Sequence, residues 1–144
     1  MSTTANKNMV FSFFENLSVG RIKAAMDLMD EKATWLVSGK PEHIPLAGTY
    51  TKQKLVDLLG LVGTVMPAGI EMTITSGTAE GDRVVVEAEV RGVSPAGKTY
   101  DNRICFVVEV RGSTIQSVRE YYDTIHTNDV LFDRTYSNEA LVEN

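Results

Sequence analysis

The sequence predicts a single α+β domain, and three observations support this fold class. Apolar residues recur at helical spacing over about the first 65 residues, then alternate with polar residues from residue 70 onward. Short turns rich in Gly, Pro and Asp divide the alternating half into strands. Helices followed by hairpin-connected strands are typical of α+β domains. A chain of 144 residues suits one hydrophobic core, which we expect over residues 5–126, with a C-terminal tail at 127–144.

The first half of the chain predicts three helices and a short strand. The opening helix has an apolar stripe of Met9, Val10, Phe13, Phe14 and Leu17, with Ser2, Thr3 or Thr4 as N-cap and Gly20 at its end. A second, short helix is expected from Ile22 to Met29. Residues 33–37 form a strand that contains Trp35, and 38–50 form a loop. A third helix begins after the potential cap Thr51 and ends before Pro67.

The second half predicts an antiparallel meander of four strands, at residues 70–79, 83–93, 98–110 and 114–124. A four-residue turn at 94–97 would place Glu89 opposite Asn102 and Glu87 opposite Ile104. A three-residue turn at 111–113 would place Glu120 opposite Ile104. One face of the sheet is then expected to carry Val85, Glu87, Glu89, Arg91, Asn102, Ile104, Phe106, Val118, Glu120 and Tyr122.

The opposite face of this expected sheet is also half apolar. It would carry Val86, Ala88, Cys105, Val107, Tyr121 and Asp123. A sheet with one solvated face should alternate cleanly between apolar and polar residues. We therefore expect helices to cover one face and a second copy of the chain to cover the other, in a homodimer.

Composition excludes several classes of function. The net charge of −5 and the lack of a basic run exclude nucleic acid as the expected partner. No apolar run is long enough to span a membrane, and the polar opening residues do not read as a leader. One cysteine and two histidines are too few for an ordinary zinc site, so no metal and no cofactor are expected. A single cysteine fits a reducing cytoplasm.

Four segments carry a resemblance to a known family. They are Pro45–Tyr50 before a helix, Tyr100–Phe106, Val118–Asp123, and an opening helix that ends in Leu17–Gly20. With these segments the chain resembles the SnoaL-like branch of the nuclear transport factor 2-like superfamily. The resemblance implies a conical barrel, with three N-terminal helices packed in the concave face of a curved, mixed, mostly antiparallel sheet around a deep cavity. Many members dimerise through the convex face.

Members of this superfamily include ketosteroid isomerases, limonene epoxide hydrolases, polyketide cyclases and proteins with no catalysis. The positions of the isomerase's catalytic set fall on Val37, Phe13 and Phe106, which cannot move a proton. The epoxide hydrolase's Asp-Arg-Asp set falls on Glu120, Glu87 and Glu89, with Glu87 in the arginine position. Arg91 is one alternate position along and could supply that charge. Neither classical set is retained.

The resemblance leaves two candidates for the principal acid–base residue. The cyclase aspartate aligns with Asp123, whereas the expected register points Asp123 to the other face and favours Glu120. Glu87 and Glu120 would flank Ile104 with carboxylates on the order of 6–10 Å apart, a spacing that suits acid–base chemistry. Alternatively, these acids lie at a solvated rim, with Arg91 paired to Glu89.

A small apolar organic molecule is the expected ligand. The side chains expected to bind it are Trp35, Tyr50, Phe13, Arg91, Asn102, Ile104, Phe106, Val118 and Tyr122, with His43 at the mouth of the pocket. The leading hypothesis is a cofactor-free cyclase, isomerase or hydrolase that uses carboxylate acid–base catalysis. The alternative is a non-catalytic dimeric ligand-binding or interaction module of the same fold.

Overall fold

In the computed structural model, which describes residues 2–136, one curved sheet is packed against helices. The elements in chain order are α1 (Thr3–Ser18), α2 (Ile22–Asp27), β1 (Met29–Val37), β2 (Gly48–Thr51), α3 (Lys52–Val65), β3 (Ile70–Glu80), β4 (Arg83–Val93), β5 (Thr99–Arg111), β6 (Thr114–Tyr121) and α4 (Thr124–Phe132). The sheet has the strand order β2-β1-β6-β5-β4-β3, and its ends do not close on each other. The β1–β6 pair is parallel and the other pairs are antiparallel. The predicted α+β fold with a mixed, mostly antiparallel sheet is confirmed.

Side-chain caps explain where three of the helices begin. Ser2 Oγ accepts a hydrogen bond from the backbone N–H of Ala5, and Thr51 Oγ1 accepts one from Lys54 at the start of α3. Asp123 accepts from the N–H of His126 and begins α4. Helix α4 includes the position, residue 127, at which the core was expected to end and a tail to begin. It begins at Thr124, where the end of a strand was expected. The residues of the expected tail from 137 onward lie outside the described part of the chain.

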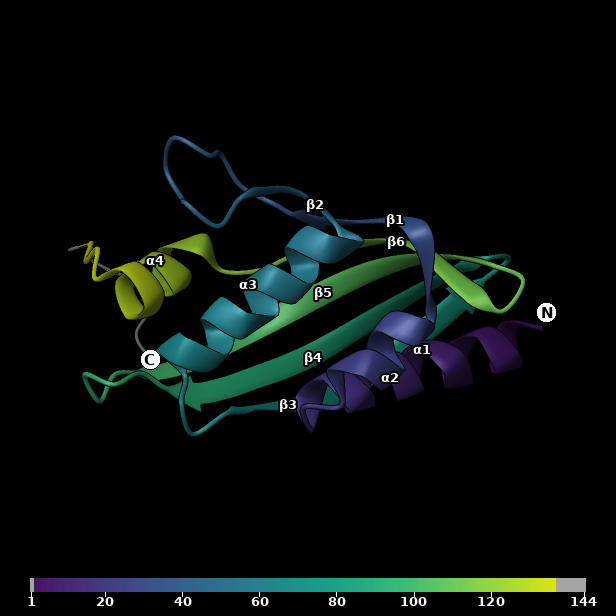
Figure 1. The fold of residues 1–144 in the computed structure, drawn as a ribbon, viewed down its shortest axis with the longest axis horizontal. Helices are drawn as coiled ribbons and strands as arrows, with labels where there is room; N and C mark the ends of the chain where they lie inside the picture. Colours follow the sequence, from purple (N-terminus) through teal and green to yellow (C-terminus); the bar gives the residue numbers. More distant parts are fainter. Residues whose placement is uncertain (1, 137–144) are drawn as a thin grey trace, which may run out of the picture.

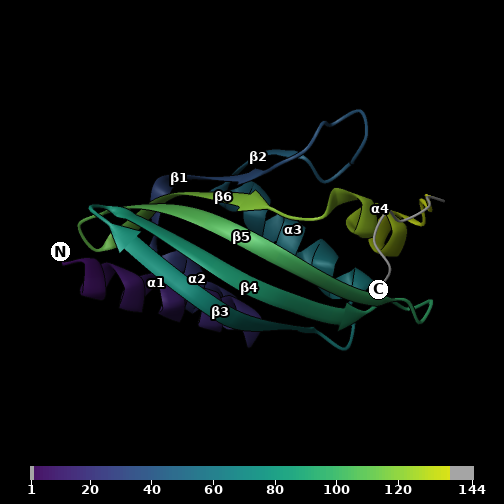
Figure 2. The same cartoon turned by 180° about the vertical axis from the view of Figure 1, so that it is seen from behind.

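The helices α1, α2 and α3 lie on one face of the sheet (Figure 1), and α3 crosses it diagonally. The view from behind shows β3, β4, β5 and β6 with no helix in front of them (Figure 2). We call the helix-covered side the inner face and the other the outer face. At the centre of the inner face Phe14 packs on Phe106, with ring centroids 4.4 Å apart, and both rings contact Trp35.

The expected register of β4 against β5 is wrong by one residue. The turn has five residues, because the N–H of Ser94 donates to the carbonyl of Lys98 and the first strand pair is Val93 with Thr99. Gly97 adopts a left-handed conformation with φ of 82° inside this turn, which favours glycine. Side chains alternate along a strand, so a shift of one residue moves every β4 side chain to the opposite face.

The expected register of β5 against β6 is wrong by two residues, which leaves the faces unchanged. The turn has two residues rather than three, because Arg111 pairs with Thr114. A bulge then skips Gln116, between the pairs Val110–Ile115 and Glu109–Ser117. The two single shifts add, so Glu120 still faces inward but lies opposite Phe106, not Ile104.

With the corrected register, the β4 side chains that were expected on one face of the sheet lie on the other. Val86 and Ala88 are buried in the core, so they cannot belong to the dimer surface that the sequence predicted. Glu87, Glu89 and Arg91 lie on the outer face, opposite Cys105, Arg103 and Asp101. The expected placement of these three side chains beside Glu120 is therefore wrong.

Candidate functional site

A cavity of about 120 Å³ lies between the inner face of the sheet and the helices. Its wall is almost entirely apolar. The lining residues from the sheet are Trp35, Val37, Ile70, Met72, Val90, Tyr100, Ile104, Phe106 and Glu120, and those from the helices and connecting segments are Leu17, Leu46, Leu58, Val62, Met66 and Leu131. An apolar cavity of roughly 150 Å³ can hold benzene, so this one suits a small organic molecule.

Glu120 is the one charged residue of this lining. It lies on β6 beside Val37 of the parallel strand β1. The indole N–H of Trp35 donates a 2.9 Å hydrogen bond to Glu120 Oε1. Burial raises the pKa of the Glu120 carboxyl to about 7, although the Trp35 hydrogen bond acts in the opposite direction. Near neutral pH the cavity therefore contains both the acid and its conjugate base.

No positive charge balances this carboxylate among the residues that the structure describes. The cavity lining includes no Lys, Arg or His, and no ion pair of residues 2–136 involves Glu120. A buried acid normally has a cationic or multiple hydrogen-bonding partner. An unpaired acid in an apolar cavity is a feature typical of functional sites.

Three phenols surround Glu120. Burial is the main cause of the raised pKa values of Tyr50, Tyr100 and Tyr122, and the charge of Glu120 adds to all three. Tyr50 and Tyr122 donate their hydroxyls to the carbonyls of Leu46 and Ser38, so their rings fix the loop that follows β1. Neither of these two phenols lines the cavity, whereas Tyr100 does.

Asn102 supports Tyr100 and does not face the cavity. Its amide donates to the Tyr100 hydroxyl and to Thr127, and it also bonds both backbone groups of Asp123. Thr127 Oγ1 lies 3.1 Å from the Tyr100 hydroxyl and donates to the carbonyl of Asp123. The Tyr100 hydrogen can therefore be donated to Thr127 or to a bound molecule. With its pKa raised to about 12, Tyr100 stays a neutral donor.

The expected pair of Glu87 and Glu120 does not form. Glu87 is exposed on the outer face, where its carboxylate accepts from Ser76 Oγ at 2.8 Å. Glu89 lies 3.9 Å from Arg103, and Arg91 lies 3.4 Å from Asp101. These acids have partners on the outer side of the sheet, so Glu120 is the only expected catalytic carboxylate that lines the cavity.

The other expected site residues divide into lining, core and surface. Trp35, Ile104 and Phe106 line the cavity. Phe13 and Val118 are fully buried in the core behind it. His43 is exposed in the loop after β1, and its carbonyl accepts a hydrogen bond from Asn128. Asp123 is an exposed helix cap, so its side chain does not enter the cavity.

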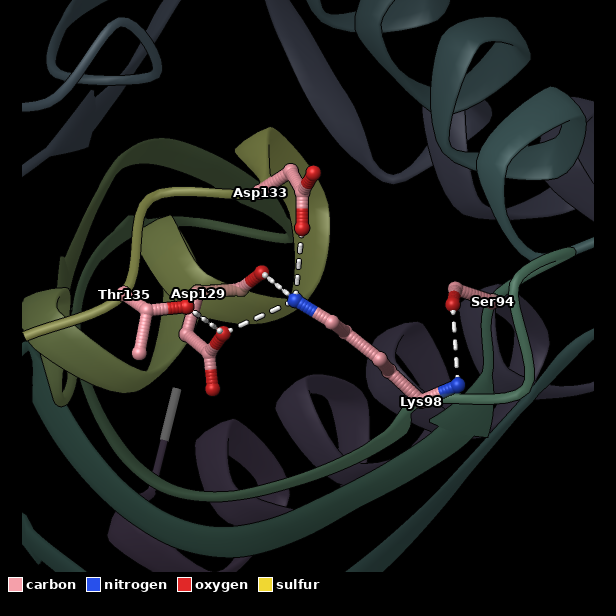
Figure 3. Close-up of polar contacts among 5 residues, drawn as sticks. All are labelled: Ser94, Lys98, Asp129, Asp133 and Thr135. Atoms are coloured by element: carbon pink, nitrogen blue, oxygen red, sulfur yellow. Dashed lines mark hydrogen bonds and ion pairs between the residues drawn. The ribbon is translucent and has the colours of Figure 1, made fainter.

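Helix α4 closes one end of the cavity through Leu131. A lysine from the β4–β5 turn holds this helix in place (Figure 3): Lys98 Nζ donates to the carbonyl and the carboxylate of Asp129, and to Asp133. The Lys98 backbone N–H donates to Ser94 Oγ, which fixes the turn from which the lysine extends. We call these contacts of Lys98 with Asp129 and Asp133 the Lys98 clasp.

The sequence interpretation missed several lining residues, chiefly Tyr100, Met66 and Leu131. Tyr100 follows from strict alternation with Ile104 once the strand face is known. The signal for Leu131 was the potential cap Asp123 followed at helical spacing by the apolar residues Val130 and Leu131. In the described residues no helix is long and apolar enough to cross a membrane, and no cluster of three potential metal ligands occurs.

The curved sheet and its covering helices define a fold of the nuclear transport factor 2-like class. A model of the SnoaL-like domain matches residues 10–118. The chain belongs to the SnoaL-like family. The comparison with curated proteins gives no match.

Solved structures agree with this assignment. A nuclear transport factor 2-like protein from Burkholderia xenovorans LB400 is 29% identical, with a TM-score of 0.73, covering 91% of this chain and 98% of that chain. A putative SnoaL-like polyketide cyclase from Jannaschia sp. CCS1 is 16% identical, with a TM-score of 0.74 and coverages of 90% and 92%. A protein of ketosteroid isomerase-like fold from Catenulispora acidiphila DSM 44928, in complex with trimethylamine, is 17% identical, with a TM-score of 0.72 and coverages of 89% and 97%.

Proposed function

We propose that this protein is an enzyme that moves a proton next to a carbonyl group of a small, neutral, mostly apolar molecule, with Glu120 as the acid–base residue. The observation that carries the proposal is an unpaired carboxyl, with a pKa of about 7, inside an apolar cavity. A general acid or base works best when its pKa lies near the working pH. Fold similarity to a putative polyketide cyclase adds support.

The proposed step uses one carboxyl twice. Ionised Glu120 removes a proton from the carbon next to the carbonyl, and the electron pair of that C–H bond moves to form an enolate. Tyr100 keeps its proton and donates a hydrogen bond to the enolate oxygen. Protonated Glu120 then returns the proton to carbon, which completes an isomerisation, or to the oxygen formed when the enolate carbon has closed a ring onto a second carbonyl. No second carboxylate is needed.

Hydrogen–deuterium exchange tests this proposal without knowledge of the natural substrate. In D₂O the protein should accelerate loss of the butan-2-one proton signals next to the carbonyl, followed by ¹H NMR. Glu120→Gln should reduce that acceleration by about 100-fold or more, because a general base is lost. Two controls should retain it: Glu71→Gln removes an exposed acid of β3, and Asp123→Asn keeps the cap of α4. A loss with Asp123→Asn but not with Glu120→Gln would refute the assignment.

A second candidate is a non-catalytic binding module for a small organic cation. The carboxylate of Glu120 has no cationic partner, and Trp35 and Phe106 supply aromatic faces of the kind that bind ammonium groups. A protein of similar fold is known in complex with trimethylamine.

The pH dependence of binding separates the two candidates. A cation binds the ionised form of Glu120, so tetramethylammonium affinity should rise as the pH rises through about 7. A neutral ketone gains no such attraction from the ionised carboxylate, so its affinity should not rise over the same range. Fluorescence of Trp35, the chain's only tryptophan, reports both titrations.

We also propose a cytoplasmic homodimer that pairs through the outer face, which keeps Cys105 and Tyr121 of the side chains that the sequence indicated but not Val86 and Ala88. This face has a shallow hollow of about 560 Å³ that includes Cys105 and Tyr121, and Tyr121 is 44% exposed. Acids and arginines are interspersed around it, for example Glu89 and Arg103. Two copies can therefore meet with opposite charges in contact. Sedimentation at micromolar concentration should give twice the chain mass of 15.8 kDa, and a monomer would contradict the proposal.

A further inference from the structure

An apolar groove lies on the surface between the α1–α2 connection and the C-terminal half of α3. Its volume is about 420 Å³, larger than the 120 Å³ of the cavity. Its lining contains no charged residue; Val19, Leu59 and Ala68 are among the side chains that form it. Val19 is 58% exposed and extends the apolar lining of the groove to the surface.

The groove and the cavity share a wall. Leu17, Val62, Met66 and Ile70 line both spaces, so one layer of side chains separates them. Met66 is the flexible member of this layer, because its unbranched side chain has several rotatable bonds. It packs against Gly92 of β4, where a Cβ atom would lie 3.1 Å from the Met66 sulfur. Met66 is therefore the residue of this shared wall whose side chain is most able to change conformation.

Helix α3 is weakly held beside this wall. Leu55, near its start, is its one buried residue. Gly60 and Gly63 lie in its last turns and have nothing within 4 Å of the position of a Cβ atom. The helix end that borders the groove therefore has room to shift when the wall opens.

We propose that the groove is a subsite for the aliphatic chain of a ligand whose carbonyl head lies at Glu120. The proposal rests on the proposed function and adds the substrate class: an elongated molecule with a compact polar head and an unbranched chain longer than the cavity can hold. A cavity of about 120 Å³ holds roughly four groups the size of a water molecule. The shared wall has apolar side chains on both sides, so a longer chain that passes it stays in apolar contact.

A homologous series of 2-alkanones, from butan-2-one to dodecan-2-one, measures this subsite through Trp35 fluorescence. Each buried methylene strengthens binding about fourfold. Affinity should therefore continue to rise beyond hexan-2-one. Decan-2-one should bind at least about tenfold more tightly than hexan-2-one. If affinity stops rising at hexan-2-one, the groove is not a subsite, although the cavity assignment stands. If no ketone changes the fluorescence, the subsite and the proposed function fail together.

Two glycine substitutions on the same helix supply a matched pair. Gly63 lines the groove, whereas Gly60 does not, and each has open space around its Cβ position. Gly63→Phe should fill the groove and remove the gain of decan-2-one over hexan-2-one, with butan-2-one affinity unchanged. Gly60→Phe makes the same change in helix propensity and should leave the whole series unchanged. Equal effects of the two substitutions on decan-2-one would overturn the subsite.

Discussion

Two glutamates lie on neighbouring strands, Glu109 on β5 and Glu120 on β6. Each is partly buried, but their pKa values are shifted in opposite directions. Glu109 lies 2.8 Å from Arg83 and 3.3 Å from Arg119. Burial alone would raise its pKa, yet the two arginines lower it below the ordinary value. Glu120 has only the neutral indole of Trp35, and its pKa is raised to about 7. The charge of the partner, more than burial, decides which state each acid prefers.

This difference separates the two faces of the sheet by role. On the outer face Glu87, Glu89 and Glu109 have hydroxyl or cationic partners, which suits a polar or self-complementary surface. On the inner face one acid is left without a countercharge in an apolar space. An acid in that environment destabilises the folded protein when it ionises, so its presence indicates a role other than stability.

The largest expected effect is a gain of stability when Glu120 is replaced by glutamine. The unfolded chain loses this proton near pH 4.5 and the folded chain near pH 7, so the protein loses stability as pH rises between these values. That difference corresponds to about 3 kcal/mol. Glu120→Gln keeps an oxygen for the Trp35 N–H and should be more stable by up to this amount at pH 8. The gain should vanish below about pH 4.5; urea unfolding at both pH values measures it.

Glu109→Gln should have the opposite sign. It removes the negative partner of Arg83 and Arg119, so the protein should lose roughly 1 kcal/mol at pH 7. The loss should shrink as pH falls through the lowered pKa of Glu109, because the carboxyl is then protonated in both states. The same unfolding experiment serves as the measurement. Equal signs for the two substitutions would refute the contrast between the faces.

Trp35→Phe should raise the pKa of Glu120 further. The indole hydrogen bond stabilises the ionised form and is worth about 1 kcal/mol, which corresponds to less than one pH unit. The pH midpoint of butan-2-one exchange should therefore rise from about 7 toward 8. A midpoint that falls would show that the indole does not stabilise the carboxylate.

The smallest expected effect concerns the Lys98 clasp. Lys98→Met should loosen α4 only slightly, because the ion pairs to Asp129 and Asp133 are solvated. Faster hydrogen exchange of α4 backbone amides, with β4 unchanged, would report it. The control is Lys23→Met, which removes an exposed pair with Asp27 and should not change α4. Unchanged exchange in α4 would mean that Asn128 and the buried helix face hold it alone.

Periodicity predicted the order of α1, α2, β1, α3 and β3 to β6, whereas β2 and α4 were not expected. Strand β4, Arg83–Val93, has the predicted limits. What periodicity could not supply was the number of residues in each turn. One extra residue in the turn at Ser94–Lys98 moved Glu87, Glu89 and Arg91 to the outer face.

Glu120 was predicted on the correct face although its strand partner was wrong, because two register errors of one residue each add to two and leave the face unchanged. A turn one residue shorter and a bulge at Gln116 each shift the pairing by one, and the sum preserves the face. The absence of a partner for Glu120 in the described residues could not be predicted, because it depends on β4 showing its apolar side to the cavity. Helix α4 was missed because its nine residues follow a strand without a glycine or proline to mark the change.

The most direct test of the central claim is the titration of Glu120 itself. Glutamate labelled with ¹³C at the carboxyl carbon gives one resonance for each residue, and Glu120→Gln identifies the resonance of interest. This resonance should titrate with a midpoint of about 7, well above that of Glu109, whose pKa is lowered by its two arginines. A midpoint near the ordinary value of 4.5 would show that Glu120 is solvated or paired with a cation, and would contradict the account of the cavity.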